Sequence, residues 1–258
     1  MQETLAKLPA LCGLHRTRWW LAGVRQAIPW LGKCCLTTLW RTLRRFGVQY
    51  KRGRRHVHSP DWEYPSKVQR LETIAWYSRQ EPGRLVRLYE DELTYYRRPT
   101  LAQGYAPCGK DTPHAEQGQG ANTARRIAAC LDVETGRLLA WQRAHFDRQT
   151  LLQFYLSVEQ SYPHAEQIFL IHDNWPVHWH PDLLEGLRGS KLTLVGLPTY
   201  APWLNPVEKV WRKLYQEVLH LHPWVNAWER LQTTVQAWLD KWAEGSSALL
   251  RSVGLCPG

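Results

Sequence analysis

The stretch TYAPWLNPVEKVWRKLY, residues 199–215, changes from a turn-rich run into a helix within a few residues. Pro202, Asn205 and Pro206 mark the turn, and the apolar residues that follow recur at helical spacing. Asn205 and Pro206 make a good pair for the N-cap and first position of that helix. Glu208 falls in the first turn, where the helix dipole favours an acid, but so rigid an entry could equally hold one carboxylate of a metal site.

Two further acids stand at the ends of predicted strands. The segment RLVRLYED, residues 84–91, reads as a strand ending in Asp91, and EQIFLIHDN, residues 166–174, reads as a buried strand ending near Asp173. Catalytic groups of open α/β sheets gather beyond strand ends. Carboxylates from two strand ends and the start of a helix would suit Mg²⁺ or Mn²⁺ rather than zinc, as in two-metal phosphoryl transfer.

The elements around these acids predict one α/β domain, which we place at residues 63–258. A helix is expected near residues 66–80, and the two segments at 125–133 and 136–144 are typical of a hairpin. A helix at 148–162, strands at 166–174 and 190–198, and helices from 206 onward complete the chain. This order predicts a mixed sheet flanked by helices.

Residues 1–62 differ in charge from the rest of the chain, whose formal net charge is +10. Residues 1–60 hold 12 Lys and Arg against the single acid Glu3, whereas residues 61–258 hold 21 against 22 acids. Such asymmetry favours a nucleic-acid-binding part joined to a part with another task, although a solvated basic surface is the simpler alternative.

The basic part contains two predicted helices, at residues 17–28 and from about residue 34 to residue 46. The second would place Leu36, Leu39, Trp40, Leu43 and Phe46 on one face. Hydroxyls and arginines on or near its other face favour a helix-turn-helix, winged-helix-like DNA-binding domain, with two solvated amphipathic helices as the alternative. The predicted DNA-contacting residues are Thr37, Thr38, Arg41, Arg44, Arg45, Lys51, Arg52, Arg54 and Arg55.

Cysteine and histidine patterns give little support to other chemistry. Six cysteines have neither paired nor regular spacing, so neither a disulfide framework nor a zinc ribbon is indicated. His172, His178 and His180 surround Asp173 without the spacing of a zinc motif, and we expect polar surface there rather than zinc. The chain has no run of apolar residues long enough to span a membrane and no signal peptide, which predicts a cytoplasmic protein without a membrane partner.

Three blocks of the sequence, taken in order, carry a family resemblance. They are LYEDELTYYRRPTLAQGYAPCGK, LIHDNWPVHWH and LPTYAPWLNPVEKVWRKLY, and 34 residues separate Asp173 from Glu208. The chain resembles the DDE transposases of the insertion sequence 630 and mariner superfamily over nearly its whole length. By that resemblance residues 63–258 have a ribonuclease H-like fold, and the protein would be a bacterial, nucleoid-associated one.

The resemblance also implies a site. Asp91, Asp173 and Glu208 would be the catalytic residues and would hold two Mg²⁺ or Mn²⁺ ions, while Glu90 merely flanks Asp91. Glu92, Asn174, Asn205 and His178 would support the metal ligands, and His178 could instead contact DNA or a metal-bound water.

The implied activity is transposition: metal-dependent cleavage of double-stranded DNA at terminal repeats and transfer of the freed 3′ hydroxyl into target DNA. A homodimer on DNA is expected. Family members usually carry a further N-terminal helix-turn-helix subdomain, so the chain could lack its first DNA-binding unit. The alternative function is a catalytically silent or truncated transposase-derived DNA-binding protein. Three intact acids favour the enzyme, because a protein that only binds DNA has no need for mutually repelling carboxylates.

Overall fold

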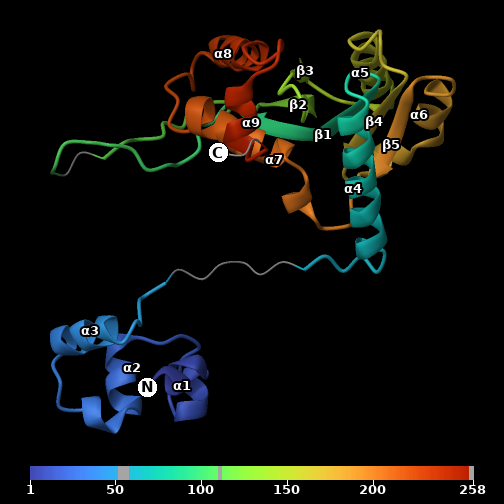
Figure 1. Ribbon diagram of the computed structural model, residues 1–258. Helices are drawn as coiled ribbons and strands as arrows, with labels where there is room; N and C mark the ends of the chain where they lie inside the picture. The colour runs from blue at the N-terminus through green and yellow to red at the C-terminus, as the bar shows by residue number, and fades with distance from the viewer. Residues whose placement is uncertain (52–57, 110–111, 256–258) are drawn as a thin grey trace. The chain divides into compact units, whose positions relative to one another are not determined.

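The computed structural model describes residues 1–51, 58–109 and 112–255. It divides the chain into two compact units, Met1–Val57 and His58–Gly258 (Figure 1). The first residues of the second unit are tied to it by hydrogen bonds. The Ser59 hydroxyl donates to the Thr199 carbonyl at 2.6 Å, and the Asp61 carboxylate accepts from the Thr199 amide at 2.8 Å. The Pro-containing segment before the second unit's first helix is therefore part of that unit's packing.

The first unit is a small helical body. Its elements are α1 (Gln2–Ala6), a 3-10 helix (Pro9–Cys12), α2 (Leu21–Ala27), a 3-10 helix (Pro29–Leu31) and α3 (Leu36–Arg45). No strand occurs among residues 1–51. A single apolar cluster forms its core, built from Val24, Ile28, Leu31, Leu39 and Leu43. The two predicted helices are both present, and α2 is shorter than the sequence pattern suggests.

Helix α3 buries a narrower face than the sequence predicts. Leu39 and Leu43 are buried, but Leu36, Trp40 and Phe46 are 44%, 45% and 53% exposed. These three residues share the predicted face with Leu39 and Leu43 but stay outside the core. The physical reason is size: the unit is small, and the core that α3 forms with Val24, Ile28 and Leu31 takes in only its Leu39 and Leu43. The Trp40 ring lies instead under the guanidinium of Arg44, 5.1 Å away.

The second unit is organised around a five-stranded mixed sheet. Its strands are β1 (Leu85–Tyr96), β2 (Ala124–Asp132), β3 (Leu138–Arg143), β4 (Gln167–His172) and β5 (Leu192–Gly196). The order across the sheet is β3-β2-β1-β4-β5, with β1, β2 and β3 antiparallel and β4 and β5 parallel to β1. All five strands coincide with predicted ones, and the mixed sheet is confirmed.

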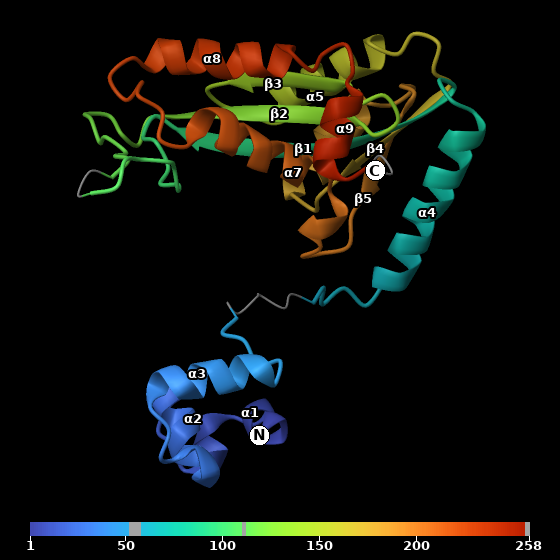
Figure 2. The same ribbon diagram turned by 60° about the vertical axis from the view of Figure 1, so that its left-hand side comes forward.

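Helices cover both faces of this sheet. Helices α7 (Val207–Leu214), α8 (Trp228–Asp240) and α9 (Ser247–Val253) pack on one face along β1, β2 and β3 (Figure 2). Helices α5 (Arg148–Gln160) and α6 (Pro181–Gly186) pack on the other face. Helix α4 (Tyr64–Gln80) places Leu71 and Ile74 against β4 and β5. A 3-10 helix (Pro176–Trp179) precedes α6, and a π-helical turn (Tyr215–Leu219) follows α7.

Strand β1 is longer than the sequence predicts, so Asp91 lies inside it rather than at its end. The parallel pairing with β4 stops at Tyr89 and Ile171, whereas the antiparallel pairing with β2 continues to Tyr96. The hairpin partner therefore carries β1 past the point where its other neighbour ends. Continued along the strands, the register of β1 and β4 brings Asp91 level with Asp173.

The β2–β3 turn depends on Gly136, and this provides a test of the fold. Gly136 has φ +72°, and a Cβ added there would lie 2.3 Å from the backbone oxygen of Ser246, the N-cap of α9. Gly83 has a similar φ of +81° but open space around it. We expect Gly83→Ala to cost about 1 kcal/mol from backbone strain. Gly136→Ala should cost more than about 3 kcal/mol, because it adds a backbone clash. Urea unfolding of both variants checks this, and equal costs would contradict the packing described here.

Candidate metal centre

The three predicted acids come from three different elements of the second unit. Asp91 lies on β1 and points to the face covered by α7, where the Trp211 indole N–H donates to its Oδ2 at 2.9 Å. Asp173 begins the loop after β4, and Glu208 stands exposed in the first turn of α7. The strand register and the packing of α7 on β1 bring these elements to the same place.

The electrostatics of the acids show that they are neighbours. Burial, followed by the charges of Glu208 and Asp173, raises the pKa of Asp91 to about 7, while the Trp211 hydrogen bond opposes that rise. Burial also raises the pKa of Glu208, which Arg212 lowers and the charge of Asp173 raises. The charge of Asp173 therefore acts on both Asp91 and Glu208, and that of Glu208 acts on Asp91, so like charges converge in a partly buried place.

Asp173 differs from the other two acids because it remains readily ionised. Its Oδ1 lies 3.4 Å from Nε2 of His178 and accepts from the Trp175 amide at 2.8 Å. The contact with His178 is the main cause of its lowered pKa, which burial opposes. Asp173 can therefore bind a cation across the neutral pH range without first losing a proton.

Two asparagines tie the loops of the site to the sheet. The Asn205 side-chain amide donates to the Glu90 carbonyl at 3.0 Å, and its oxygen accepts from the Val207 amide at 3.1 Å. It therefore holds the first residue of α7 and fastens that helix to β1. Asn174 donates from its side chain to the Leu197 carbonyl at 2.8 Å, which joins the loop after β4 to the loop after β5.

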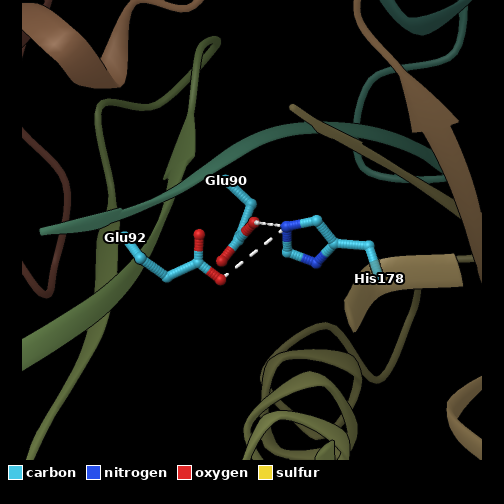
Figure 3. Close-up of side chains that lie close together, drawn as sticks. All are labelled: Glu90, Glu92 and His178. Carbon is cyan, nitrogen blue, oxygen red and sulfur yellow. Dashed lines mark ion pairs between the residues drawn. The ribbon is translucent and has the colours of Figure 1, made fainter. Parts of the chain in front are cut away.

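A second group of side chains lies on the opposite face of β1. Glu90 and Glu92 point toward the imidazole of His178, which comes from the 3-10 helix Pro176–Trp179 (Figure 3). Their ligand atoms all lie within 4.8 Å of one another. Burial, then the charges of Glu92, Asp91 and Asp173, raises the pKa of Glu90 well above its usual range. Burial and the charge of Asp91 raise the pKa of Glu92 to about 8.

From the sequence, Glu90 was expected only to flank Asp91, and its cluster with Glu92 and His178 was not predicted. The signal was present, because residues two apart on a strand share a face. Glu90 and Glu92 must point away from Asp91, and a fully buried Glu90 is then unusual. What the sequence does not contain is the position of His178, which reaches the pair through the fold.

The histidines near Asp173 are mostly buried, which corrects the expectation of polar surface. His172 and His178 are both 0% exposed, and their rings lie 4.3 Å apart. Burial, and then the neighbouring His178, lowers the pKa of His172 to about 3. A direct contact of His178 with DNA is incompatible with this burial. His180 alone of the three is exposed, and it caps α6 by accepting from the Asp182 amide.

The predicted DNA-contacting residues of the first unit are exposed where the structure describes them. Thr37, Thr38, Arg41, Arg44 and Arg45 lie on the surface of α3, and Lys51 is exposed beyond it. Arg52, Arg54 and Arg55 lie outside the described residues. Apart from the contact of Arg44 with Trp40, no ion pair or ring contact occupies the three α3 arginines among the described residues. Their charges are available to a partner.

The sequence profile of the DDE superfamily endonucleases matches residues 86–241. A protein of Shigella sonnei described as an insertion element IS630 uncharacterized 39 kDa protein is 23% identical over 235 residues, which cover 90% of this chain and 67% of the relative. Within the described residues, no helix is both long and apolar enough to span a membrane.

Solved structures of the Mos1 mariner transposase have a similar fold. Its paired-end complex with the left transposon end matches with a TM-score of 0.62 at 15% identity, over 89% of this chain and 69% of that one. The Mos1 paired-end complex with Mg matches with a TM-score of 0.64 at 14% identity, over 89% of this chain and 70% of that one.

The fold, the converging carboxylates and the matching profile define a class of DNA-cutting enzyme, and the chain belongs to the DDE superfamily endonucleases. The predicted resemblance to transposases of the insertion sequence 630 and mariner superfamily is confirmed, as is the ribonuclease H-like fold. Endonuclease activity follows from the family. Other solved structures of Mos1 with a similar fold are described as a paired-end complex with Mn and as a strand transfer complex.

The raised pKa of Asp91 predicts how stability depends on pH in metal-free protein. Between its ordinary pKa of 3.8 and about 7, folded Asp91 holds more protons than unfolded Asp91, so stability falls as pH rises through this range. In EDTA, Asp91→Asn should therefore be more stable than wild type at pH 8, by at most about 4 kcal/mol, with a smaller difference at pH 5. Urea unfolding at both pH values measures it.

Asp61 provides a control of opposite sign. The Lys67 side chain lowers the pKa of Asp61 to about 2, so its carboxylate stabilises the fold above its ordinary pKa. Asp61→Asn should lower stability at pH 8, whereas Asp91→Asn raises it. A loss of stability in Asp91→Asn at pH 8 would show that its carboxyl is not destabilised by its surroundings.

Proposed function

We propose that the enzyme cuts DNA at transposon ends and transfers the freed 3′ hydroxyl into target DNA, with Asp91, Asp173 and Glu208 holding two Mg²⁺ or Mn²⁺ ions. The observation that carries this proposal is the convergence of the three carboxylates. They are delivered by β1, by the end of β4 and by the start of α7. The charge of Asp173 raises the pKa of both Asp91 and Glu208, and that of Glu208 raises the pKa of Asp91.

The residues present fit divalent cations. Neither Asp91 nor Glu208 forms an ion pair with a Lys or Arg within the described part of the chain, so the charge of Arg212 and the hydrogen bond from Trp211 offset their repulsion only in part. Hard, oxygen-only ligand sets of this kind suit Mg²⁺ and Mn²⁺. When bound, the ions would activate the attacking hydroxyl or water and neutralise charge on the phosphate and the leaving oxygen.

The remaining residues hold the carboxylates in place. Trp211 fixes one oxygen of Asp91, and the Trp175 amide fixes one oxygen of Asp173. Asn205 sets the position of α7, and with it Glu208, relative to β1. Asp91 stands on a strand, Asp173 on a loop that Asn174 ties to the next loop, and Glu208 on a helix that Asn205 fastens to β1. The site is therefore preorganised, which reduces the cost of bringing like charges together.

The first unit supplies the affinity for DNA in this proposal. The exposed hydroxyls and arginines of α3 are suited to the major groove, and Lys51 to the phosphate backbone. The Mos1 complexes are described as paired-end complexes, which supports a homodimer acting on two DNA ends. The alternative, a silent DNA-binding descendant, is disfavoured by three intact acids that repel one another.

Replacing the acids tests the catalytic assignment. Asp91→Asn, Asp173→Asn and Glu208→Gln should each lower metal-dependent cleavage of a supercoiled plasmid carrying the flanking DNA by about a thousandfold or more, because each removes a metal ligand. DNA binding should change little. Glu229→Gln is the matched control, because Glu229 is an exposed acid in the first turn of α8. Full cleavage by any of the three variants would remove that residue from the triad, and cleavage by neither wild type nor variants would favour the silent alternative.

Removing the three arginines of α3 tests the DNA-binding assignment. Arg41, Arg44 and Arg45 replaced together by Ala should weaken DNA binding and reduce the slope of log affinity against log salt by about 2 to 3, because each phosphate contact contributes about 0.9. Fluorescence anisotropy across a salt series gives this slope.

A control variant that loses three positive charges elsewhere in the chain distinguishes a direct contact with DNA from an effect of net charge. Arg188, Arg230 and Arg251 are exposed residues of the second unit, and their joint replacement by Ala is the control. An unchanged slope in the α3 variant, or an equal change in the control, would show that α3 is not the contact surface.

A further inference from the structure

The buried carboxylate of Glu90 is not explained by the proposed reaction. Glu90 is 0% exposed, and neither of its oxygens has a hydrogen-bond partner among the described residues. Glu92 follows on the same face of β1, and its Oε1 is likewise buried and unpartnered. Burying an ionised carboxylate without a partner is among the largest costs in a folded protein, so Glu90 needs either a proton or a positive charge beside it. A positive charge in this pocket would remove that cost.

His178 completes the pocket (Figure 3). Its Nε2 lies 3.8 Å from Glu90 Oε2 and 3.7 Å from Glu92 Oε1, and it too has no hydrogen-bond partner among the described residues. These distances are too long for hydrogen bonds. Two ligands held about 2.1 Å from one ion lie roughly 3.0–3.4 Å apart, so a movement of a few tenths of an ångström would seat an ion between them.

Tyr155 orients the imidazole. The Tyr155 hydroxyl lies 2.8 Å from Nδ1 of His178, and both side chains are buried. When Nδ1–H donates to that hydroxyl, the lone pair of Nε2 points at the two carboxylates. Metal-binding histidines are held in this way, with the second ring nitrogen donating to a neighbouring acceptor. In that tautomer Nε2 carries no hydrogen to donate to Asp173, and it faces only acceptors, the carboxylates of Glu90, Glu92 and Asp173.

We propose that Glu90, Glu92 and His178 form a further metal site that binds a divalent transition ion, Zn²⁺ or Mn²⁺. One imidazole nitrogen with two carboxylates suits these ions better than Mg²⁺, which prefers oxygen ligands alone. The site shares no ligand with the proposed catalytic triad. The 18% exposure of the Glu92 side chain and the 57% exposure of Asp173, whose Oδ1 is 3.4 Å from Nε2, give an ion a path inward.

An ion in this site would fasten the loop after β4 to the middle of the sheet. His178 belongs to that loop, and Glu90 and Glu92 belong to β1. The bound ion would therefore hold the loop that carries Asp173 against the strand that carries Asp91. This inference goes beyond the proposed function, because the ion can bind whether or not the catalytic ions are present.

The test is a Mn²⁺ titration of the full chain after treatment with EDTA, followed by electron paramagnetic resonance with a pulsed measurement of nitrogen coupling. Wild type should bind a Mn²⁺ ion whose spectrum shows one imidazole nitrogen. The double variant Asp91→Asn, Glu208→Gln should keep this signal. His178→Gln should lose the nitrogen signal, and Glu90→Gln should bind that ion at least about tenfold more weakly. Tyr155→Phe should weaken binding about 10- to 100-fold.

His222→Gln is the matched control, because His222 is also buried with an unpartnered Nε2 but has no carboxylate within ion-pair distance among the described residues. Circular dichroism checks that each variant folds. If His178→Gln does not fold, the wild-type spectrum and Tyr155→Phe still decide the question.

If the wild-type spectrum shows no nitrogen coupling, the proposal is wrong, and Glu90 is neutralised by a proton instead of a metal ion. If the double variant loses the coupling, the proposal is also wrong, because His178 would then be a ligand of the catalytic ions. Plasmid cleavage by wild type with Mg²⁺ is measured separately, so failure of the proposed function would be seen independently of this site.

Discussion

The structure of the second unit is constrained by three consecutive carboxyl groups, Glu90, Asp91 and Glu92, in the middle of its central strand. Strand β1 pairs with β2 on one side and β4 on the other, so it cannot move these groups to the surface. Alternation along the strand sends Asp91 to one face of the sheet and the two glutamates to the other. Burial raises the pKa of all three carboxyl groups. Each face of the sheet must therefore supply groups that stabilise either the ionised or the protonated form of these carboxyls.

The two faces meet this demand differently. On the face covered by α7, the Trp211 indole N–H contacts Asp91, and Glu208 approaches from the start of the helix. On the opposite face, His178 and Tyr155 close over Glu90 and Glu92. Asp173 lies between these environments, since it influences Asp91 and Glu208 and also contacts His178. An ion bound on either face would change the charge experienced on the other, because the five acids and His178 form one series of interacting groups.

Much of the fold could be predicted because the second unit has strong periodic signals. The buried strand at 166–174, the hairpin and the helix that begins after Pro206 are local patterns whose type does not depend on distant partners. The length of β1 depends on such a partner, since only the pairing with β2 extends it to Tyr96. The exposure of Trp40 and Phe46 on α3 has a related reason. Both have the spacing of core residues, but the first unit leaves each about half exposed, with Arg44 over the Trp40 ring and Trp30 edge-on to Phe46.

The sequence by itself determined the family and the order of the elements, and it predicted Asp91, Asp173 and Glu208 as the acids of the site, because these features are encoded in residue types and spacing along the chain. It also determined that Glu90 and Glu92 share a face, since strand alternation is local. Only the tertiary structure decided that Glu90 is fully buried and that His178, 88 positions later, faces it with Tyr155 behind. The burial of Glu90 and its approach to His178 depend on how α5 and the loop after β4 pack on the sheet, and no local sequence pattern contains that information.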